Sequence, residues 1–292
     1  MNTNVSAIVI TFHPDPDHLM DMINTLRSQV QRIIIINNGP VFHLAKGDDV
    51  VFEVFNLSEN MGIGHATNIG LRIALERQSS HILVCDQDTT FPIGYVDSLL
   101  ETMSPECSVL VPNYYDTISN TSAKRFAIKS HLESSVVTSK ERVPVSQAIA
   151  SGMLIKRHVF DEGIIFNEKL FIDWVDFEWC WRVRKAGMTI EMRTDIFLEH
   201  RLGSYSRKIF KKFVNIRSAD RHYYITRNAV YLSLYCPFLR LPFRVKLFAK
   251  ALLFLFGYPM LGKPFLSNGH ATSLGFFHGL IGKLGPITKG FL

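Results

Sequence analysis

The chain has 292 residues, of which 47% are hydrophobic and 20% are charged, and its four cysteines lie far apart with no C-x-x-C pair. These features exclude a disordered chain, a disulfide scaffold and a zinc knuckle, and they fit a reducing compartment. The net charge of +6 combines −8 in residues 1–200 with +14 in residues 201–292, where Asp220 is the one acidic residue. Such a basic tail is expected to meet a polyanion, which could be nucleic acid, a phosphorylated substrate or an anionic membrane.

The first 112 residues alternate between short apolar runs and amphipathic segments, as a parallel α/β sheet requires. Strands are predicted at 5–11, 32–36, 50–55, 81–85 and 109–111, and helices at 16–30, 64–77 and 95–103. The polar, Ser- and Thr-rich segment 113–143 is interpreted as an excursion over the active face. Periodicity returns at 145–156, a helix is expected around 176–186, and from about 207 the chain is expected to be helical and basic.

No secretory signal is predicted, because no basic segment precedes the first apolar run. The longest apolar candidate, residues 251–262, has 12 residues and contains a glycine and a proline. A membrane-spanning helix needs roughly 18 to 20 such residues, so none is predicted.

Polar residues follow three of the predicted strands. They are Thr11, the pair Asn37 and Asn38, and the run Asp86-Gln87-Asp88. The carboxyl ends of parallel strands share one edge of a sheet, where ligands bind. Two carboxylates one residue apart at this edge favour a site for Mg²⁺ or Mn²⁺. The alternative for the acidic run alone is a solvated turn.

Two further segments carry candidate chemistry. The turn from Asn60 to Gly70, which contains Gly62 and Asn68, offers backbone amides and a helix N-terminus to an anion, although such turns are also common helix caps. Residues 171–182 place three carboxylates beside three tryptophans. Aromatic neighbours can tune an acid toward proton transfer and can stack on sugars. The alternative is an amphipathic helix with the indoles in the core.

Taken in order, these motifs resemble those of inverting glycosyltransferases of family 2, and in detail those of bacterial rhamnosyltransferases of cell-surface polysaccharide synthesis. The resemblance spans residues 5–230 and includes Ser151-Gly152, His200 and the run Arg221-x-Tyr223-Tyr224-x-x-Arg227-Asn228. It implies an α/β, GT-A type fold, with a Rossmann-like nucleotide-binding core, a mostly parallel mixed sheet and a helical C-terminal region. The implied domains are a catalytic domain at 1–205, with a donor half at about 1–112 and an acceptor half at about 143–205, and a basic helical region at 206–292.

The resemblance also implies a role for each matching residue. Asp176 is expected to be the general base. The metal is expected at Asp86, Asp88 and His200, while the alternative for His200 alone is a structural role. The donor-binding residues are expected to be Thr11, Asn37, Asn38, Gly62, Asn68, Asp86 and Gln87. The acceptor-binding residues are expected to be Asp173, Trp174, Glu178 and Arg227.

The sequence departs from the family pattern at two positions. Asn37 stands where the family more often has Asp, and Val175 stands where it has the Glu that precedes the base. Asp173 is predicted to replace that second carboxylate in space.

Residues 242–256 predict a basic amphipathic helix. Arg240, Arg244, Lys246 and Lys250 lie on one arc, and the opposite side carries Leu241, Val245, Phe248, Leu252, Leu255 and Phe256. Such helices bind membrane surfaces. The alternative is a core helix with a solvated basic face. Nucleic acid is not expected as a partner, because no recognised module accompanies the charge.

The predicted enzyme transfers L-rhamnose from dTDP-L-rhamnose to a lipid-diphosphate-linked oligosaccharide in O-antigen or capsule synthesis. It uses Mg²⁺ or Mn²⁺ and lies peripherally on the cytoplasmic face of the cell membrane. The alternatives are a family-2 transferase with a UDP-hexose donor, and a catalytically silent sugar-nucleotide-binding membrane scaffold.

Overall fold

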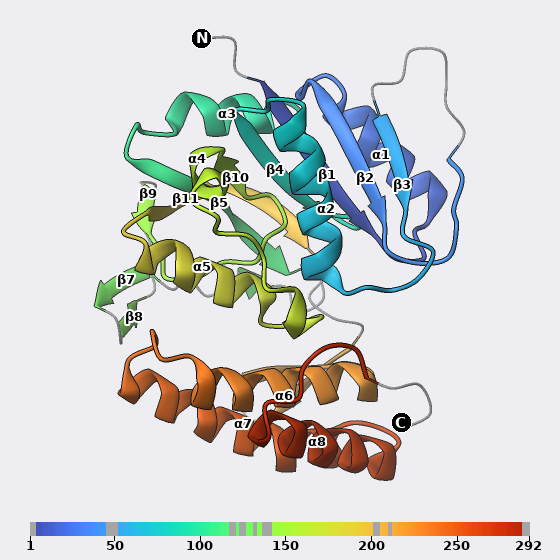
Figure 1. The fold of residues 1–292 in the computed structure, drawn as a ribbon, viewed down its shortest axis with the longest axis vertical. Coiled ribbons are helices and arrows are strands. Elements are labelled where there is room, and N and C mark those ends of the chain that lie inside the picture. Colours follow the sequence, from blue (N-terminus) through green and yellow to red (C-terminus); the bar gives the residue numbers. More distant parts are fainter. Residues whose placement is uncertain are drawn as a thin grey trace. The chain divides into compact units, whose positions relative to one another are not determined.

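The computed structural model describes residues 4–44, 52–116, 121–122, 127–130, 133–135, 142–200, 205–209 and 212–287 (Figure 1). The chain divides into two compact units. The first unit comprises Met1–Tyr115, Ser122–Phe166 and Asp176–His200. The second unit comprises Asp116–Thr121, Asn167–Val175 and Arg201–Leu292. The short segment Asn167–Val175 therefore belongs with the C-terminal region, although the sequence on either side of it belongs to the first unit.

The first unit is built on a nine-stranded sheet with the order β3-β2-β1-β4-β10-β5-β11-β9, and β6 pairs with β5. Its strands are β1 (Val5–Thr11), β2 (Arg32–Asn37), β3 (Phe52–Asn56), β4 (His81–Asp86), β5 (Cys107–Asp116), β6 (Thr121–Ser122), β9 (Arg142–Pro144), β10 (Leu154–Lys156) and β11 (Thr189–His200). β1 pairs in parallel with β2 and β4, and β2 pairs in parallel with β3. β10 is antiparallel to both β4 and β5, so β5 runs in the same direction as β4. The predicted mixed α/β sheet is confirmed.

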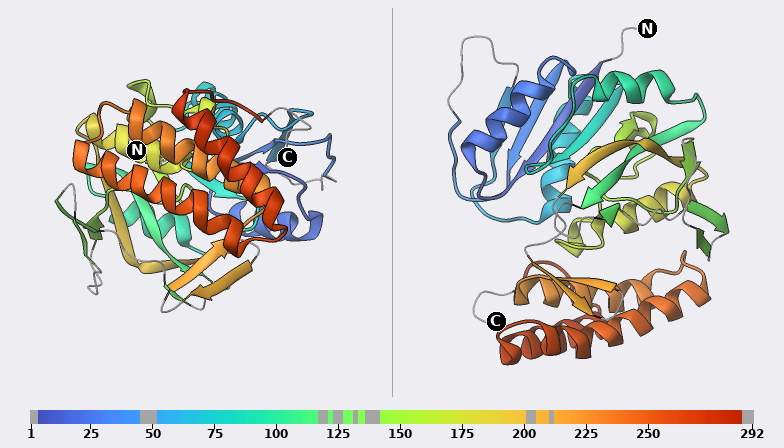
Figure 2. Two further views of the ribbon diagram at one scale, coloured as in Figure 1. Left: turned by 90° about the horizontal axis from the view of Figure 1, so that it is seen from below. Right: turned by 180° about the vertical axis from the view of Figure 1, so that it is seen from behind.

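Helices cover both faces of this sheet. They are α1 (Pro16–Leu26), α2 (Ile63–Glu76), α3 (Tyr95–Thr102), α4 (His158–Asp161) and α5 (Val175–Lys185). Alternate residues of β1, such as Ala7 and Val9, pack in one core with the apolar sides of α1 and α3. α2 contacts β1 and β2, and Figures 1 and 2 show it on the opposite face of the sheet from α1. The central strands are buried on both faces, which explains the uninterrupted apolar run of β2.

The four cysteine thiols are all buried: Cys85, Cys107, Cys180 and Cys236. Burial raises the pKa of Cys85 well above its ordinary value, and it raises the pKa of Cys107 and of Cys180 to about 12. These side chains therefore act as small apolar core residues.

The second unit contains three helices that contact one another, α6 (Ala219–Tyr235), α7 (Leu241–Leu261) and α8 (Phe265–Leu280). It also contains a 3-10 turn (η1) at Glu168–Leu170 and an antiparallel hairpin of β12 (Tyr205–Ile209) and β13 (Lys212–Ile216). The expectation of helix from about residue 207 is therefore wrong for 207–209 and 212–216. A separate two-stranded pair joins β7 (Ala127–Ser130) to β8 (Glu133–Ser135).

Apolar residues of α7 point both inward and outward. Leu247, Ala251 and Tyr258 are buried, and the Tyr258 ring stacks on His222 of α6 at 3.9 Å between centroids. Val245, Leu253, Phe256 and Met260 are exposed. The prediction of one apolar side opposite one basic side is therefore incomplete, because α7 has both a buried and an exposed set of apolar residues. Within the part of the chain that the structure describes, no helix is both long enough and apolar enough to span a bilayer.

Candidate active site

Strand register brings the predicted polar residues to one edge of the sheet. Thr11 pairs with Asn37, and Ile10 pairs with Asp86, so the last residues of β1, β2 and β4 lie side by side. Asn37 is also in register with Asn56 at the end of β3. The polar residues expected at one edge of the sheet therefore do lie together there. Their roles in binding remain predictions.

Asn37 is almost completely buried, and its side chain makes hydrogen bonds to three other residues at this edge. Its amide nitrogen donates to Asn56 Oδ1 at 2.6 Å and to Pro40 O at 2.7 Å. Its amide oxygen accepts from Thr11 Oγ1 at 3.3 Å. An aspartate here would have no N–H groups to donate, so the asparagine suits this network of acceptors.

Asn38 fixes the turn that leads to α2. Its Oδ1 accepts from Met61 N at 2.8 Å, and its Nδ2 donates to Asn60 Oδ1 at 3.1 Å. Gly62 follows with φ of +89° and precedes the first residue of α2. Asn68 lies in the second turn of α2, and its amide pairs with both the N–H and the C=O of Phe166, each at 2.9 Å. These contacts give Asn68 an architectural role beside its predicted place in the donor site.

The Asp86-Gln87-Asp88 turn is fastened on two sides. Gln87 accepts from Phe12 N at 2.6 Å and donates to Phe12 O at 3.1 Å, which joins the turn to the end of β1. The backbone N–H of Asp86 donates to Ser151 Oγ at 2.9 Å. Asp86 is half-buried and Asp88 is exposed, so the two carboxylates of the turn differ in their access to solvent.

The segment 149–152 connects this turn to the predicted base. Ser151 Oγ, which holds the Asp86 backbone, also lies 2.7 Å from Thr89 Oγ1. The neighbouring Ala150 N donates to Asp176 Oδ2 at 3.1 Å. Adjacent residues of one segment thus hold Asp86 and Asp176. Sequence reasoning noticed Ser151-Gly152 as a family feature and assigned it no role, because the contacts that give it one come from distant parts of the chain.

Tyr114, which sequence reasoning missed, binds the backbone of the segment that holds both carboxylates. Its hydroxyl donates to Ser151 O and, at 3.2 Å, to Ile149 O. Burial raises the pKa of Tyr114 well above its ordinary value, and the negative charges of Asp86 and Asp176 raise it further. A phenol that stays protonated in this way can hold the 149–152 segment by donation.

Gly152 is required by the same arrangement. Its φ is +78°, and a Cβ built on it would lie 2.4 Å from Leu198 Cδ1 and 2.8 Å from Tyr95 Oη. Tyr95 in turn donates to Gly152 O at 2.6 Å. A side chain at this position would displace the segment that holds Asp86 and Asp176.

The remaining residues of α5 have clear structural partners. Glu178 is buried and forms a two-point ion pair with Arg182, at 2.8 and 2.9 Å. Trp179 is completely buried, stacks on Phe166 at 4.9 Å and donates its indole N–H to Ile164 O. The contacts of Trp179 favour the interpretation that this indole belongs to the core, and the predicted acceptor contact of Glu178 stays a prediction.

Three of the predicted acceptor residues belong to the second unit. Asp173 makes two hydrogen bonds of 2.7 Å with Arg221 and a longer ion pair with Arg217 at 3.7 Å. Trp174 donates its indole N–H to Ile225 O at 3.0 Å. Arg227 is completely buried. A side chain that does not reach solvent cannot contact a saccharide in this conformation, so these observations favour a supporting role for Arg227.

The predicted metal ligands are only partly brought together. Among the residues that the structure describes, no three His, Cys, Asp or Glu side chains are close enough together to hold a metal ion. The side chain of His200, predicted as the third ligand, lies outside the described residues. Asp86 and Asp88 nevertheless supply two hard oxygen donors on one tight turn, which fits a divalent cation whose remaining ligands come from water and a diphosphate.

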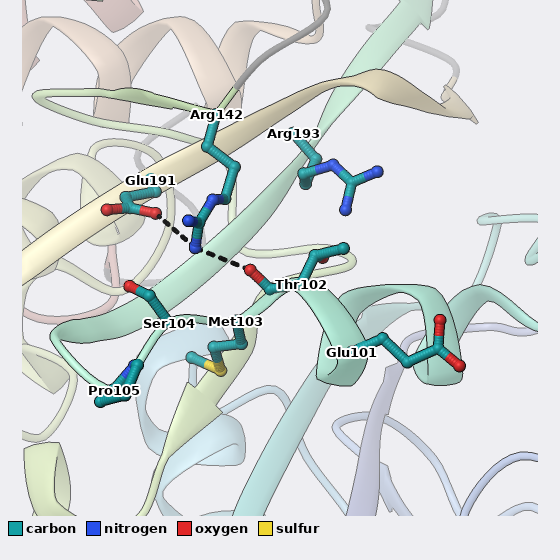
Figure 3. A pocket seen from close by; sticks show the side chains of 8 residues that line it. All are labelled: Glu101, Thr102, Met103, Ser104, Pro105, Arg142, Glu191 and Arg193. Carbon is teal, nitrogen blue, oxygen red and sulfur yellow. Dashed lines mark hydrogen bonds and ion pairs between the residues drawn. The ribbon is translucent and has the colours of Figure 1, made fainter.

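A pocket of about 730 Å³ lies elsewhere in the first unit (Figure 3). Its lining residues are Glu101, Thr102, Met103, Ser104, Pro105, Arg142, Glu191 and Arg193. Arg142 reaches across it, with a 2.7 Å hydrogen bond to Thr102 O and a 3.4 Å ion pair to Glu191. The residues 101–105 precede β5, which runs parallel to β4, so this pocket is at the opposite edge of the sheet from Asp86. None of the predicted site residues lines it.

Comparisons with known proteins identify the family of the chain. Residues 6–164 match the family profile described as "Glycosyl transferase family 2". The chain is 30% identical over 242 residues to dTDP-rhamnosyl transferase RfbF of Shigella flexneri, and the match covers 80% of each chain.

Two solved structures share the fold at 13% identity. GalNAc-T7, solved with UDP, GalNAc and Mn²⁺, matches with a TM-score of 0.55. The match covers 88% of this chain and 57% of the GalNAc-T7 chain. Residues 1–349 of TarS from S. aureus give a TM-score of 0.54 and cover 95% of this chain and 81% of that one. The GT-A fold expected from the resemblance is confirmed, and with the family match it follows that the chain belongs to glycosyltransferase family 2 and is a glycosyltransferase.

Proposed function

We propose that the protein is an inverting rhamnosyltransferase that takes L-rhamnose from dTDP-L-rhamnose. The observation that carries this proposal is the 30% identity to a dTDP-rhamnosyl transferase, spread over 80% of both chains. The proposed acceptor is a lipid-diphosphate-linked oligosaccharide of O-antigen or capsule synthesis.

Asp176 would act as the base that accepts the proton of the attacking acceptor hydroxyl. Its Oδ2 is held by Ala150 N, and this contact limits rotation of the carboxylate. Attack on the anomeric carbon from the side opposite the leaving diphosphate inverts that centre. A nucleoside diphosphate is a good leaving group without protonation, so one base suffices where glycoside hydrolysis needs two carboxylates.

Asp86 would lie against the ribose and, with Asp88, would hold a divalent cation, with His200 as a third ligand. The cation supplies positive charge that stabilises the departing diphosphate. Support comes from the two hard oxygen donors of the turn after β4. The Mn²⁺ in the GalNAc-T7 crystal is consistent with such a use of the fold.

The donor alternative is a UDP-hexose. UDP is present in GalNAc-T7, but at 13% identity that structure speaks for the fold alone. A panel of dTDP-L-rhamnose and UDP-hexoses, each incubated with a lipid-linked acceptor and measured by mass spectrometry, separates the two. A catalytically silent scaffold would bind a nucleotide sugar from this panel and give no product.

The proposed base is tested by Asp176→Asn. The amide keeps the size of the side chain and cannot accept the proton, so turnover should fall by about 10²- to 10⁴-fold. Donor binding, measured by calorimetry, should stay close to that of the wild type. Asp161→Asn is a matched control, because it removes a carboxylate that is half exposed and pairs with Arg157 on the surface of α4.

Activity of Asp176→Asn within about threefold of wild type would remove Asp176 from this role. Asp173 and Glu178 would then be the next candidates. Both form short ion pairs with arginines in this structure, so either would have to leave its partner before it could accept a proton.

The proposed location is the cytoplasmic face of the cell membrane, with the second unit as the contact. Val245, Leu253, Phe256 and Met260 are exposed and, at about 100° per residue, fall within an arc of about 80° on α7. Phe265 and Leu266, at the start of α8, are exposed as well. Exposed aromatic and aliphatic side chains in such a strip are typical of helices that lie in a membrane interface.

Charge supports the same location. No acidic residue follows Asp220, and Lys246 lies beside the exposed strip of α7. Two of the four basic residues predicted for this helix make contacts inside the unit. Arg244 donates to Ser233 O and Leu234 O, and the Lys250 ammonium lies 5.0 Å from the Trp174 ring. Arg240 and Lys246 are exposed and would contact anionic headgroups.

A further inference from the structure

The loop between η1 and α5 has an unusual backbone. Phe171, Asp173 and Trp174 have φ values of 66°, 63° and 66°. Residues with side chains avoid this left-handed region, and three of them within four positions require stabilisation from their surroundings. The loop ends directly before Val175, the first residue of α5, and Asp176 is the second.

Asn228 of α6 binds this loop through its side chain. It is completely buried, and its amide nitrogen donates to the carbonyl oxygens of Leu170, Ile172 and Asp173 at 3.0, 2.9 and 2.9 Å. Its amide oxygen accepts from Arg227 Nε at 2.9 Å, which fixes the orientation of the amide. One side chain thus holds three of the backbone carbonyls that a left-handed loop leaves outside regular structure.

Other parts of α6 reinforce the same loop. Arg227 Nη2 donates to Leu170 O at 2.8 Å, and its guanidinium lies 4.8 Å from the Tyr224 ring. Arg221 binds the Asp173 carboxylate, and the indole of Trp174 binds Ile225 O. Positions 221, 225 and 228 are spaced by four and three residues, so they lie on one face of the helix. This face and the loop together form a clamp, defined here as Arg221, Ile225, Arg227 and Asn228 with residues 170–174.

We propose that Asn228 is a positioning residue for Asp176: by holding the carbonyls of residues 170–173 it fixes the backbone from which the first turn of α5 starts. The inference rests on the proposed function, because it takes Asp176 as the base. It assigns to the Arg227-Asn228 pair a task that needs no contact with either substrate. It also explains why both side chains are completely buried although one of them is charged.

The test is Asn228→Ala, with steady-state kinetics and donor binding measured on the same preparation. Misplacement of the base by a fraction of an ångström to an ångström should lower kcat by about 10- to 100-fold. The KM for the donor and the calorimetric affinity for dTDP should stay within about twofold, because no donor-binding residue is altered. If Asn228 only stabilised the fold, the variant would have a smaller folded fraction and a lower stoichiometry of dTDP binding. Measuring kinetics and binding on the same preparation detects this outcome.

Thr226→Val is the matched control. Thr226 lies on the same helix and is completely buried, and its hydroxyl has no hydrogen-bond partner among the residues that the structure describes. The variant should therefore turn over at the wild-type rate. A loss of kcat in Thr226→Val equal to that in Asn228→Ala would show that any change in the core of α6 suffices, and would overturn the specific role of Asn228.

Trp174→Phe serves if Asn228→Ala does not fold. This variant removes one clamp hydrogen bond, from the indole N–H to Ile225 O, and keeps an aromatic ring. It should lower kcat by a few-fold, about the effect of one lost contact, without raising the KM for the acceptor. A raised acceptor KM with unchanged kcat would instead make Trp174 an acceptor contact and would contradict the clamp.

The outcomes also separate this inference from the proposed function. Absence of rhamnosyl transfer by the wild type, or full activity of Asp176→Asn, would remove the proposed function itself. If the wild type transfers rhamnose, Asp176→Asn is impaired and Asn228→Ala turns over as fast as the wild type, the clamp alone is wrong.

Discussion

The turn after β4 gives neighbouring carboxylates different surroundings. Asp86 is half-buried and its backbone is held by Ser151, while Asp88 is exposed two residues further on. A carboxylate held on a fixed backbone suits contact with a ribose, and an exposed one can approach a cation that arrives with its diphosphate. This difference leads to a prediction about the metal.

Removal of divalent cations should abolish turnover, and Mg²⁺ or Mn²⁺ should restore it. Asp88→Ala should raise the metal concentration needed for half-maximal activity and lower the maximal rate, because a cation with one ligand fewer stabilises the diphosphate less well. Titration of activity with MgCl₂ and MnCl₂ after treatment with EDTA measures both effects.

Asp97→Ala is the control for this experiment, since Asp97 is an acidic residue in the first turn of α3, outside the predicted site. Unchanged metal dependence in Asp88→Ala would show that the cation is held elsewhere.

At the residue scale, the sequence predicted which residues lie at the sheet edge better than it predicted which side chains contact one another. Thr11, Asn37 and Asp86 follow apolar runs, and parallel pairing then places them together, so their meeting could be foreseen. The pairing of Asp173 with Arg221 crosses 48 positions of sequence and depends on tertiary structure. The suggestion that Asp173 replaces the missing glutamate before the base stays a prediction, and its carboxylate is already engaged by Arg221.

At the element scale, the strands and helices of the first 112 residues follow their hydrophobic pattern, although α1 ends at Leu26 and not at residue 30, and β5 extends over Cys107–Asp116 and not only over 109–111. The hairpin of β12 and β13 does not. Its sequence has no Asn-Gly or Asp-Gly turn, so the usual local signal of a hairpin is missing. Ile209, Phe213, Val214 and Ile216 nevertheless have high strand propensity, and pairing of the two segments satisfies their backbone groups.

Helix α7 is a second element whose structure the sequence pattern predicted only in part. Its apolar residues surround much of the helix, so the pattern could not distinguish the face that packs on α6 and α8 from the face that is exposed. Burial of Leu247 and Ala251 and exposure of Leu253 and Phe256 make that distinction. The membrane prediction can therefore be tested on residues whose replacement spares the core.

Replacing Leu253, Phe256 and Met260 together by Ser should weaken binding to vesicles. These side chains are 73%, 66% and 75% exposed, so the fold should be retained. Burial of large apolar side chains in the interface contributes on the order of 1 to 3 kcal/mol each. Co-sedimentation with vesicles of mixed neutral and anionic lipid, with circular dichroism to verify folding, provides the measurement.

Ile93→Ser is the matched control, because Ile93 is 91% exposed in the first unit and carries no predicted membrane contact. Equal sedimentation of the triple variant and the wild type would leave the exposed strip of α7 without a role in membrane binding.

At the scale of the whole chain, charge is divided unevenly. Residues 1–200 carry −8 and residues 201–292 carry +14. An anionic surface would attract the C-terminal part and repel the rest, which favours one orientation of approach. Each basic side chain near such a surface contributes about 1 kcal/mol, and salt screens this attraction while leaving the apolar contribution intact.

High salt should therefore release only part of the bound protein from anionic vesicles. The triple variant of α7 should be released almost completely under the same conditions, because only the screened attraction remains to hold it. Sedimentation across a series of NaCl concentrations compares the two proteins. Complete release of the wild type at high salt would assign its binding to charge alone, and failure of the wild type to bind at low salt would make the location proposal untenable.

Because all four thiols are buried, their reaction with a thiol reagent can be used to follow unfolding of the chain. A maleimide or disulfide reagent reacts with thiolates, and burial together with raised pKa values keeps Cys85, Cys107 and Cys180 from forming them in the folded state. Labelling during a thermal or denaturant ramp would thus mark local opening, with the first unit represented by three sites and the second by Cys236. A single cysteine introduced at Met260 would then be the one readily labelled thiol, and a fluorophore attached there would report directly on whether α7 enters a lipid interface.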